Sequence, residues 1–236
     1  MTNTTNIQKS RLERSGINRI VQVLGSLVLF GVILFIAAGR LDWWEAWIFL
    51  GIYLAGVLFN GLWSIRRNPE MMNERGKIGA NTKSWDKVIG GFYMLFLLAI
   101  FVLAGLDQRY SWSTVPLWVK ILGGVSFAIS MAITFWVMTS NTFLSTFVRI
   151  QDDRGHTTVT SGPYRFVRHP MYVGILFMSL GMPLLMGSLW AFIPGLLNII
   201  LFLIRTALED KVLQAELPGY KAYMQKVHYR LIPGIW

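Results

Sequence analysis

The longest uncharged stretch of the chain runs from Met171 to Ile204, and it limits the possible folds more than any other feature. As one helix it would be about 51 Å long at a rise of about 1.5 Å per residue, whereas a hydrocarbon core is about 30 Å thick. Pro183, Gly187 and Gly195 interrupt its middle, and such residues are typical of turns. The pattern therefore predicts a hairpin of two membrane-spanning helices, with one tilted, kinked helix as the alternative.

Four further apolar segments precede this hairpin, and each is about as long as a bilayer-crossing helix. They are Ile20–Gly39, Ala46–Ile65, Val88–Leu106 and Trp118–Thr139. With 54% hydrophobic and only 14% charged residues, the chain differs in composition from soluble globular proteins. We expect an all-α, polytopic membrane protein of about six transmembrane helices, divided into four amino-terminal spans (1–140) and a carboxyl-terminal core (141–236).

The basic residues lie mainly between the apolar segments and carry a formal net charge of +10. They concentrate at the amino end, in 66–87, in 149–168 and at the carboxyl end. Six spans put all four segments on one side, and basic loops are retained in the cytoplasm. We therefore expect cytoplasmic termini in a protein of the cell (inner) membrane. No nucleic-acid motif accompanies the charge, so we expect no nucleic-acid partner. The chain has no cysteine, which excludes disulfides, thiolate metal sites and a cysteine nucleophile.

Two polar clusters flank the predicted hairpin, and its fold would bring them to the same side of the membrane. The first is Ser161–Gly174, which crowds arginines, a histidine and tyrosines against the apolar run; the second contains Arg205 and Glu209. Such groups at a membrane boundary indicate a functional site. Arg205 and Glu209 are four residues apart and share a helical face, so an intrahelical ion pair is the alternative. For His169, the alternative is a hydrogen-bonded interfacial histidine.

Three ordered blocks of residues resemble the isoprenylcysteine carboxyl methyltransferase family, whose relatives include membrane phospholipid N-methyltransferases and small-thiol S-methyltransferases. The blocks are Gly162-Pro-Tyr164, Arg168-His-Pro-x-Tyr172 with Gly174, and Arg205-x-x-x-Glu209. The resemblance covers about Phe147 to Trp236, including a tail that begins at Leu217-Pro-Gly-Tyr220. It implies that residues 141–236 form a methyltransferase core, which binds S-adenosylmethionine at the cytoplasmic mouth and methylates a lipophilic acceptor.

The resemblance also implies roles for single residues. The implied cofactor-binding residues are Gln151, His156, Thr157, Thr158, Val159, Tyr164, His169, Pro170, Met171, Tyr172 and Glu209. Arg205 and Glu209 are the implied catalytic residues, and Arg205 would bind the acceptor's carboxylate. The chemistry agrees, because Glu209 can accept hydrogen bonds from the cofactor's amino group and an arginine can hold a carboxylate bidentately. Two departures stand out: Asp210 replaces a second glutamate, and the connector after Gln151 is shorter than in eukaryotic members.

Several readings of the function stay open. Arg205 favours a carboxylate acceptor, as in an isoprenylcysteine carboxyl O-methyltransferase, with a phospholipid amine or a small thiol as alternatives. An amine or thiol must lose a proton, and Glu209 or Asp210 would then be the base. A sterol-type membrane reductase and a non-catalytic membrane protein are readings of a different class. The histidines and carboxylates show no metal-ligand spacing, so we expect no metal. The expected partners are the lipid bilayer and the lipophilic acceptor; no pattern indicates an oligomeric state.

Overall fold

The computed structural model describes residues 11–77, 79 and 82–236, so residues 1–10 of the predicted basic amino end lie outside the described residues. All the regular elements in this part of the chain are helical, which confirms the all-α prediction. The α-helices are α1 (Arg14–Ala38), α2 (Trp44–Arg67), α3 (Pro69–Arg75), α4 (Ser84–Tyr110), α5 (Leu117–Ser140), α6 (Pro170–Met186), α7 (Phe192–Glu216) and α8 (Tyr220–Lys226). Two short 3-10 helices, η1 (Asp152–Arg154) and η2 (Gly162–Arg165), lie in the connector between α5 and α6.

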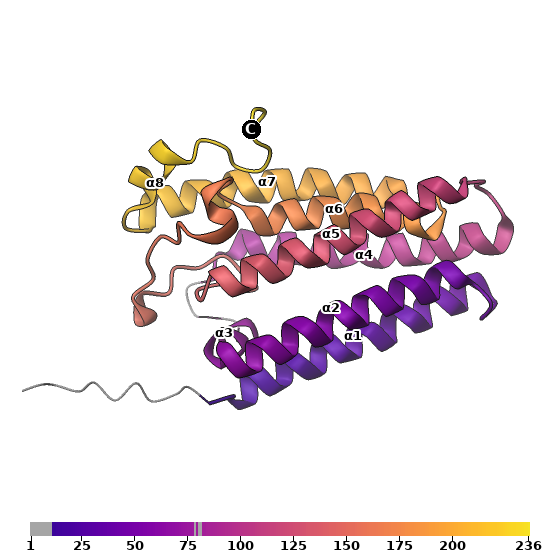
Figure 1. Cartoon of the computed structure of the whole chain (residues 1–236), viewed down its shortest axis with the longest axis horizontal. Helices are drawn as coiled ribbons and strands as arrows, with labels where there is room; N and C mark the ends of the chain where they lie inside the picture. The colour runs from indigo at the N-terminus through magenta and orange to yellow at the C-terminus, as the bar shows by residue number, and fades with distance from the viewer. Residues whose placement is uncertain (1–10, 78, 80–81) are drawn as a thin grey trace, which may run out of the picture.

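Five of the described helices are long and apolar enough to cross a membrane: α1, α2, α4, α5 and α7. Helix α6 is apolar but has only 17 residues, which gives a length of about 25 Å. It runs antiparallel to α7 and lies beside it (Figure 1). The predicted hairpin is therefore confirmed, with one shorter arm, and the single kinked helix is excluded.

The turn of the hairpin is fixed by backbone geometry and by a buried carboxylate. Gly187 ends α6 in the left-handed region at φ 71°, which glycine adopts without steric cost. Ser188 then donates to Asp107 of α4 at 2.6 Å and accepts from the amide of Ala191 at 3.1 Å. The second arm continues past the apolar run to Glu216. Helix α7 therefore carries its charged residues beyond the apolar part of the hairpin.

Small residues allow the helices of the bundle to approach closely. Helices α5 and α6 form its most extensive pair. A Cβ atom added at Gly123 of α5 would lie 2.2 Å from the backbone nitrogen of Leu185. One added at Gly181 of α6 would lie 2.8 Å from the backbone nitrogen of Phe127. Such contacts between small residues are a common basis of helix association in membranes.

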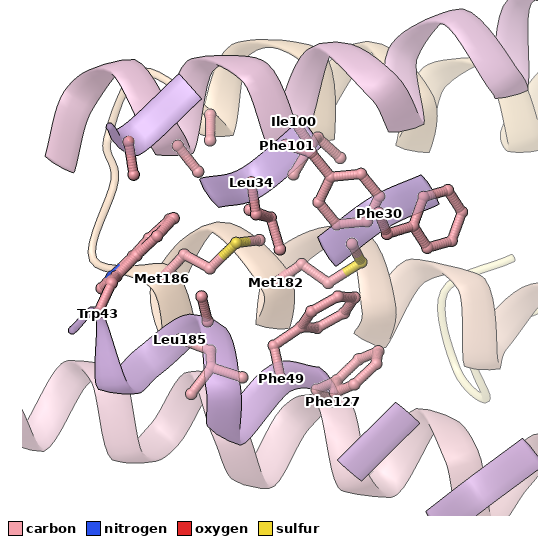
Figure 2. Packing of buried hydrophobic residues seen from close by; sticks show 14 of the residues in the cluster. Phe30, Leu34, Trp43, Phe49, Ile100, Phe101, Phe127, Met182, Leu185 and Met186 are labelled. Carbon is pink, nitrogen blue, oxygen red and sulfur yellow. The ribbon is translucent and has the colours of Figure 1, made fainter. Parts of the chain in front are cut away.

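An aromatic and methionine core joins five of the helices near the turn of the hairpin (Figure 2). Phe49 of α2 lies 5.3 Å from Phe101 of α4 and 5.1 Å from Phe127 of α5, measured between ring centroids. Phe30 of α1 and Met182 of α6 complete this layer. Many outward-facing residues are apolar and exposed, among them Ile36 at 71%, as expected of helices surrounded by lipid. The core thus fixes the bundle at one end.

The other end of the bundle holds the polar segments. Helices α3 and α8, the connector, the start of α6 and the end of α7 all lie there, and the carboxyl-terminal tail folds back over α7 (Figure 1). The amides of Arg168 and His169 donate to the carbonyls of Tyr229 and Arg230 at 2.9 and 3.0 Å. We call this region the open end of the hairpin.

Candidate active site

The two polar clusters predicted from the sequence meet at the open end of the hairpin. His169 precedes the first turn of α6, where Pro170 occupies a position at which a missing amide hydrogen costs no intrahelical hydrogen bond. Arg205 and Glu209 lie on the last turns of α7. The structure therefore brings both clusters together, as the hairpin predicted.

Asp210 forms the centre of the most densely bonded group at this end. Its fully buried carboxylate accepts two hydrogen bonds from Arg168, both at 3.0 Å. It accepts further bonds from Tyr220 at 2.7 Å and from Arg230 and Gln214 at 3.0 Å. A buried charge needs such pairing to offset its lost hydration. Asp210 therefore anchors the carboxyl-terminal tail to the hairpin.

His169 belongs to the same group. Its Nε2 atom lies 3.2 Å from Oδ1 of Asp210, and its ring stacks on Tyr172 with 5.7 Å between centroids and an interplanar angle of 2°. The interfacial, hydrogen-bonded histidine named as an alternative matches these contacts. A direct role of His169 in cofactor binding stays a prediction.

Glu209 has a different environment from its neighbour Asp210. The hydroxyl of Tyr172 donates a short hydrogen bond to Oε2 of Glu209. Within the described part of the chain, Glu209 forms no ion pair, and its other carboxylate oxygen accepts no hydrogen bond. Glu209 is only partly buried. A positioned carboxylate with a free oxygen is suited to bind a cationic group.

Arg205 pairs with a partner that the sequence analysis did not identify. Its guanidinium donates to both oxygens of Asp86 on α4, at 2.7 and 2.8 Å, and to the carbonyl of Thr146 at 3.1 Å. It also lies over the rings of Tyr172 and Phe202, at 5.3 and 5.6 Å from their centroids. The intrahelical pair with Glu209 that the spacing suggested is not formed. Asp86 is 119 residues away in sequence, so no local pattern could have indicated this pair.

Tyr164 lies in η2 and is buried. Its hydroxyl accepts a hydrogen bond from Asn141 at 2.8 Å, and its carbonyl accepts one from the hydroxyl of Tyr223 at 2.6 Å. Burial raises the pKa of Tyr164, and the negative charge of Glu209 acts in the same direction, whereas Arg75 opposes it. Tyr164 therefore stays a neutral hydroxyl at pH 7.

The connector holds the remaining predicted residues. The side chain of Gln151 is fully buried, donates to the carbonyl of Phe143 and accepts from Arg154 at 2.6 Å. His156 stacks on Phe143 at 4.6 Å. Burial lowers the pKa of His156 to about 4, with help from the charge of Arg154. The His156 ring is therefore neutral at pH 7.

Beyond His156, the segment Thr157–Val159 lies along the surface of the open end. Thr157 is exposed, Thr158 donates to the carbonyl of Pro218 at 2.8 Å, and Val159 packs against the cluster around Leu217. Met171 contacts three of the hydrophobic clusters from the first turn of α6. Whether this segment and Met171 contact a cofactor stays a prediction.

The sequence analysis missed the structural partners of the site. They are Asp86, Asn141, Arg168 and Tyr220. Arg168 and Tyr220 were visible within the resembling blocks, whereas Asp86 had only its position at the start of a span as a signal. An apolar groove of about 740 Å³ between α1 and α2 is lined by residues such as Phe35, Trp47 and Leu54. Its lining has no titratable group, so we place the chemistry at the open end.

Comparison with protein-family models gives a match in the carboxyl-terminal half of the chain. Residues 118–217 match the family model described as phospholipid methyltransferase, which is a little under half of the chain. No curated protein matches the chain. The matched segment begins in α5, includes the whole α6–α7 hairpin and ends at Leu217. It therefore contains Tyr164, His169, Tyr172, Arg205 and Glu209, and the match supports a membrane methyltransferase, an enzyme class that requires a methyl donor. The segment from α5 to the end of α7 is therefore similar to the phospholipid methyltransferase family, the family of membrane methyltransferases of the isoprenylcysteine type.

Proposed function

We propose that this protein transfers the methyl group of S-adenosylmethionine to a lipophilic acceptor at the open end of the hairpin, on the cytoplasmic face of the cell membrane. The observation that carries the proposal is the state of Glu209. Tyr172 holds its carboxylate in place, yet no cation among the described residues forms an ion pair with it. The chain therefore offers a fixed negative charge beside aromatic rings, at the end of a membrane hairpin of this family.

The residues present fit the groups of this methyl donor. Glu209 can accept hydrogen bonds from the donor's ammonium group. Tyr172 and Tyr164 are almost fully buried beside Glu209, so they would border a bound donor with a ring edge or a hydroxyl group. The surface segment of His156, Thr157, Thr158 and Val159 lies at the same end, as a binding edge would require. Bound S-adenosylmethionine would supply an electrophilic methyl group on a sulfonium.

The contribution of the chain is then mainly to position the reactants. The hydrogen bond from Tyr172 fixes Glu209, and Asp210 fixes His169 and the tail around it. Holding reactants in register and excluding water can supply most of the acceleration of such a transfer. A carboxylate acceptor needs no base. An amine acceptor must lose a proton, and Glu209 is the carboxylate with a free oxygen to receive it.

The acceptor that we favour is a lipophilic carboxylate, as in an isoprenylcysteine carboxyl O-methyltransferase, with Arg205 beside it. Arg205 is mostly neutralised by Asp86, so in this role it would hold the acceptor with the guanidinium edge that Asp86 does not occupy. The match to phospholipid methyltransferases favours a second candidate, a phospholipid amine. No specific observation favours a small thiol as the acceptor.

Acceptors with one head group and tails of increasing length test the lipophilic part of the proposal. Each buried methylene contributes about 0.8 kcal/mol, so methylation at matched sub-saturating concentrations in detergent should rise steeply with tail length. We expect this rise for one of the two head groups, the carboxylate or the amine, and not for the other. Equal rates for a water-soluble head group and its long-tailed form would reject a lipophilic acceptor.

A further inference from the structure

Two arginines from the amino-terminal half approach the open end of the hairpin. Arg75 ends α3, and its carbonyl accepts a hydrogen bond from the hydroxyl of Thr146 at 3.0 Å. The carbonyl of the same Thr146 accepts from Arg205 at 3.1 Å. Arg19 of α1 lies on the other side: a Cβ atom added at Gly76 would be 3.4 Å from the Cβ of Arg19. These contacts bring Arg19, Arg75 and the guanidinium of Arg205 to the same part of the open end.

The charges of these arginines are balanced very differently. Arg205 has both oxygens of Asp86, and nearby Arg149 pairs with Glu74. In the part of the chain that the structure describes, the side chains of Arg19 and Arg75 have neither a hydrogen bond nor an ion pair. Both side chains are only partly exposed. Nε of Arg149 is sealed from solvent and has no hydrogen-bond partner. The guanidinium nitrogens of Arg19 and Arg75 are not sealed from solvent in this way. The two guanidinium groups are therefore not fully sealed from solvent.

Electrostatics link these two arginines to the candidate active site. Burial lowers the pKa of Arg75 to about 9, and the positive charges of Arg19 and Arg205 add to the effect. Arg75 is still charged at pH 7. The charges of Arg75 and Glu209 both act on the pKa of Tyr164, in opposite directions. Arg19 and Arg75 are partly buried cations without a counter-charge among the described residues. Binding an anion would offset the free-energy cost of burying their charges.

We propose that Arg19 and Arg75 bind the anionic head group of the acceptor, a phosphate or a carboxylate, and so form a specificity site built by the amino-terminal half. The proposal rests on the proposed function for its choice of ligand. Guanidinium groups match the planar oxygens of both anions through paired hydrogen bonds. The site lies outside the segment matched by the family model. Arg205, paired with Asp86, would contact the same head group with the guanidinium edge that Asp86 does not occupy.

A binding experiment without methyl donor tests the head-group site. The probes are myristate, myristyl phosphate and methyl myristate, which share a tail but differ in charge. Calorimetry would use the full chain in matched non-ionic micelles. Both anionic probes should bind at least about 10-fold tighter than the neutral ester, as expected when a hydrogen bond to a charged group is added. The tighter of the two anions identifies the head-group chemistry. Equal affinity for all three probes would overturn the proposal.

Variants test whether Arg19 and Arg75 bind the anionic head group or have another role. Arg19→Gln and Arg75→Gln should each weaken the anionic probes about 10-fold and leave the ester unchanged. Arg75→Lys should restore part of the loss. Arg67→Gln changes an exposed arginine at the end of α2 and is the matched control; it should change nothing. The melting temperature shows that each variant is folded, and the comparison of probes on the unmodified chain does not depend on variants.

The affinity for S-adenosylmethionine, measured on the same proteins, distinguishes a failure of the head-group site from a failure of the proposed methyl transfer. If Arg75→Gln weakens the donor but none of the lipids, Arg75 belongs to the donor site and the head-group proposal is wrong. If the unmodified chain binds no donor but selects anionic probes through Arg19 and Arg75, the head-group site stands and the proposed methyl transfer fails.

Discussion

Glu209 and Asp210 are adjacent carboxylates on α7 with opposite environments. Asp210 is fully buried and takes hydrogen bonds from Arg168, Tyr220 and Arg230 among others, whereas Glu209 is partly exposed and bonded to Tyr172. A carboxylate whose lone pairs are filled holds structure together. One with a free oxygen can bind a ligand or receive a proton. At the level of single residues, we therefore assign the structural role to Asp210 and the binding role to Glu209.

Glu209→Gln should weaken S-adenosylmethionine binding about 10- to 150-fold, because a hydrogen bond to a charged group is worth roughly 1.5–3 kcal/mol. The amide keeps the shape of the side chain and loses its charge. Calorimetry on the detergent-purified protein measures the affinity. Asp153→Asn removes an exposed carboxylate of η1 and serves as the control. Unchanged donor affinity in folded Glu209→Gln would remove Glu209 from the site.

His156 makes the stability of the protein depend on pH. An unfolded histidine takes up its proton near pH 6.5, whereas burial lowers the pKa of folded His156 to about 4. The unfolded state therefore binds more protons between these values, so the stability that is present above pH 6.5 is lost as the pH falls toward 4. In His156→Gln, melting temperatures at pH 7 and pH 5 should differ less than in the unmodified protein. His228→Gln, at an exposed histidine, should keep the full difference; the same difference in His156→Gln would disprove this assignment.

At the scale of helices, the sequence was a good guide to which elements form and a poorer one to where they end. The apolar segments predicted the spans and the hairpin because hydrophobic length is read locally. Helix α1 nevertheless begins at Arg14 and α7 ends at Glu216, both in polar sequence. The pair of Arg205 with Asp86 also escaped prediction, since it depends on how α4 packs against α7. Long-range packing is the part of the site that local patterns do not contain.

The attachment of the carboxyl-terminal tail is the element-scale feature with the largest expected energy. Asp210→Asn leaves Arg168 and Arg230 without their shared counter-charge. Breaking a buried ion pair by removing one partner costs about 3–5 kcal/mol. We expect a clear loss of thermal stability and earlier proteolytic cleavage between Glu216 and the carboxyl end. Glu216→Gln breaks the exposed pair with Lys83 and should cost less than about 1 kcal/mol. Similar behaviour of the two variants would mean that Asp210 does not hold the tail.

At the scale of the whole molecule, the two ends of the bundle have different tasks. The aromatic core near the hairpin turn binds α1, α2, α4, α5 and α6 together (Figure 2). The open end collects charged residues from both halves of the chain, including Asp86 from α4 and Glu209 from α7. The predicted division at residue 140 stays a prediction. The amino-terminal helices nevertheless contribute directly to the polar end.

Cysteine labelling tests the arrangement of these ends across the membrane. The chain has no cysteine, so a single introduced thiol reports one position without background. Trp190→Cys places a thiol at the exposed hairpin turn, and Ile235→Cys places one at the carboxyl end. In intact cells, a membrane-impermeant maleimide should label the first and not the second, since basic segments are retained inside. Labelling of both, or of the second alone, would reject the proposed orientation.

The most direct test of the central claim is transfer of a radiolabelled methyl group. Purified protein, labelled S-adenosylmethionine and a lipid extract from the source cells are incubated, and the label is counted in the organic phase. We predict label in the lipid fraction with the unmodified chain and with Asp153→Asn. At sub-saturating donor, Glu209→Gln should give at least about 10-fold less. No label above a protein-free control, or equal labelling by Glu209→Gln, would contradict the account.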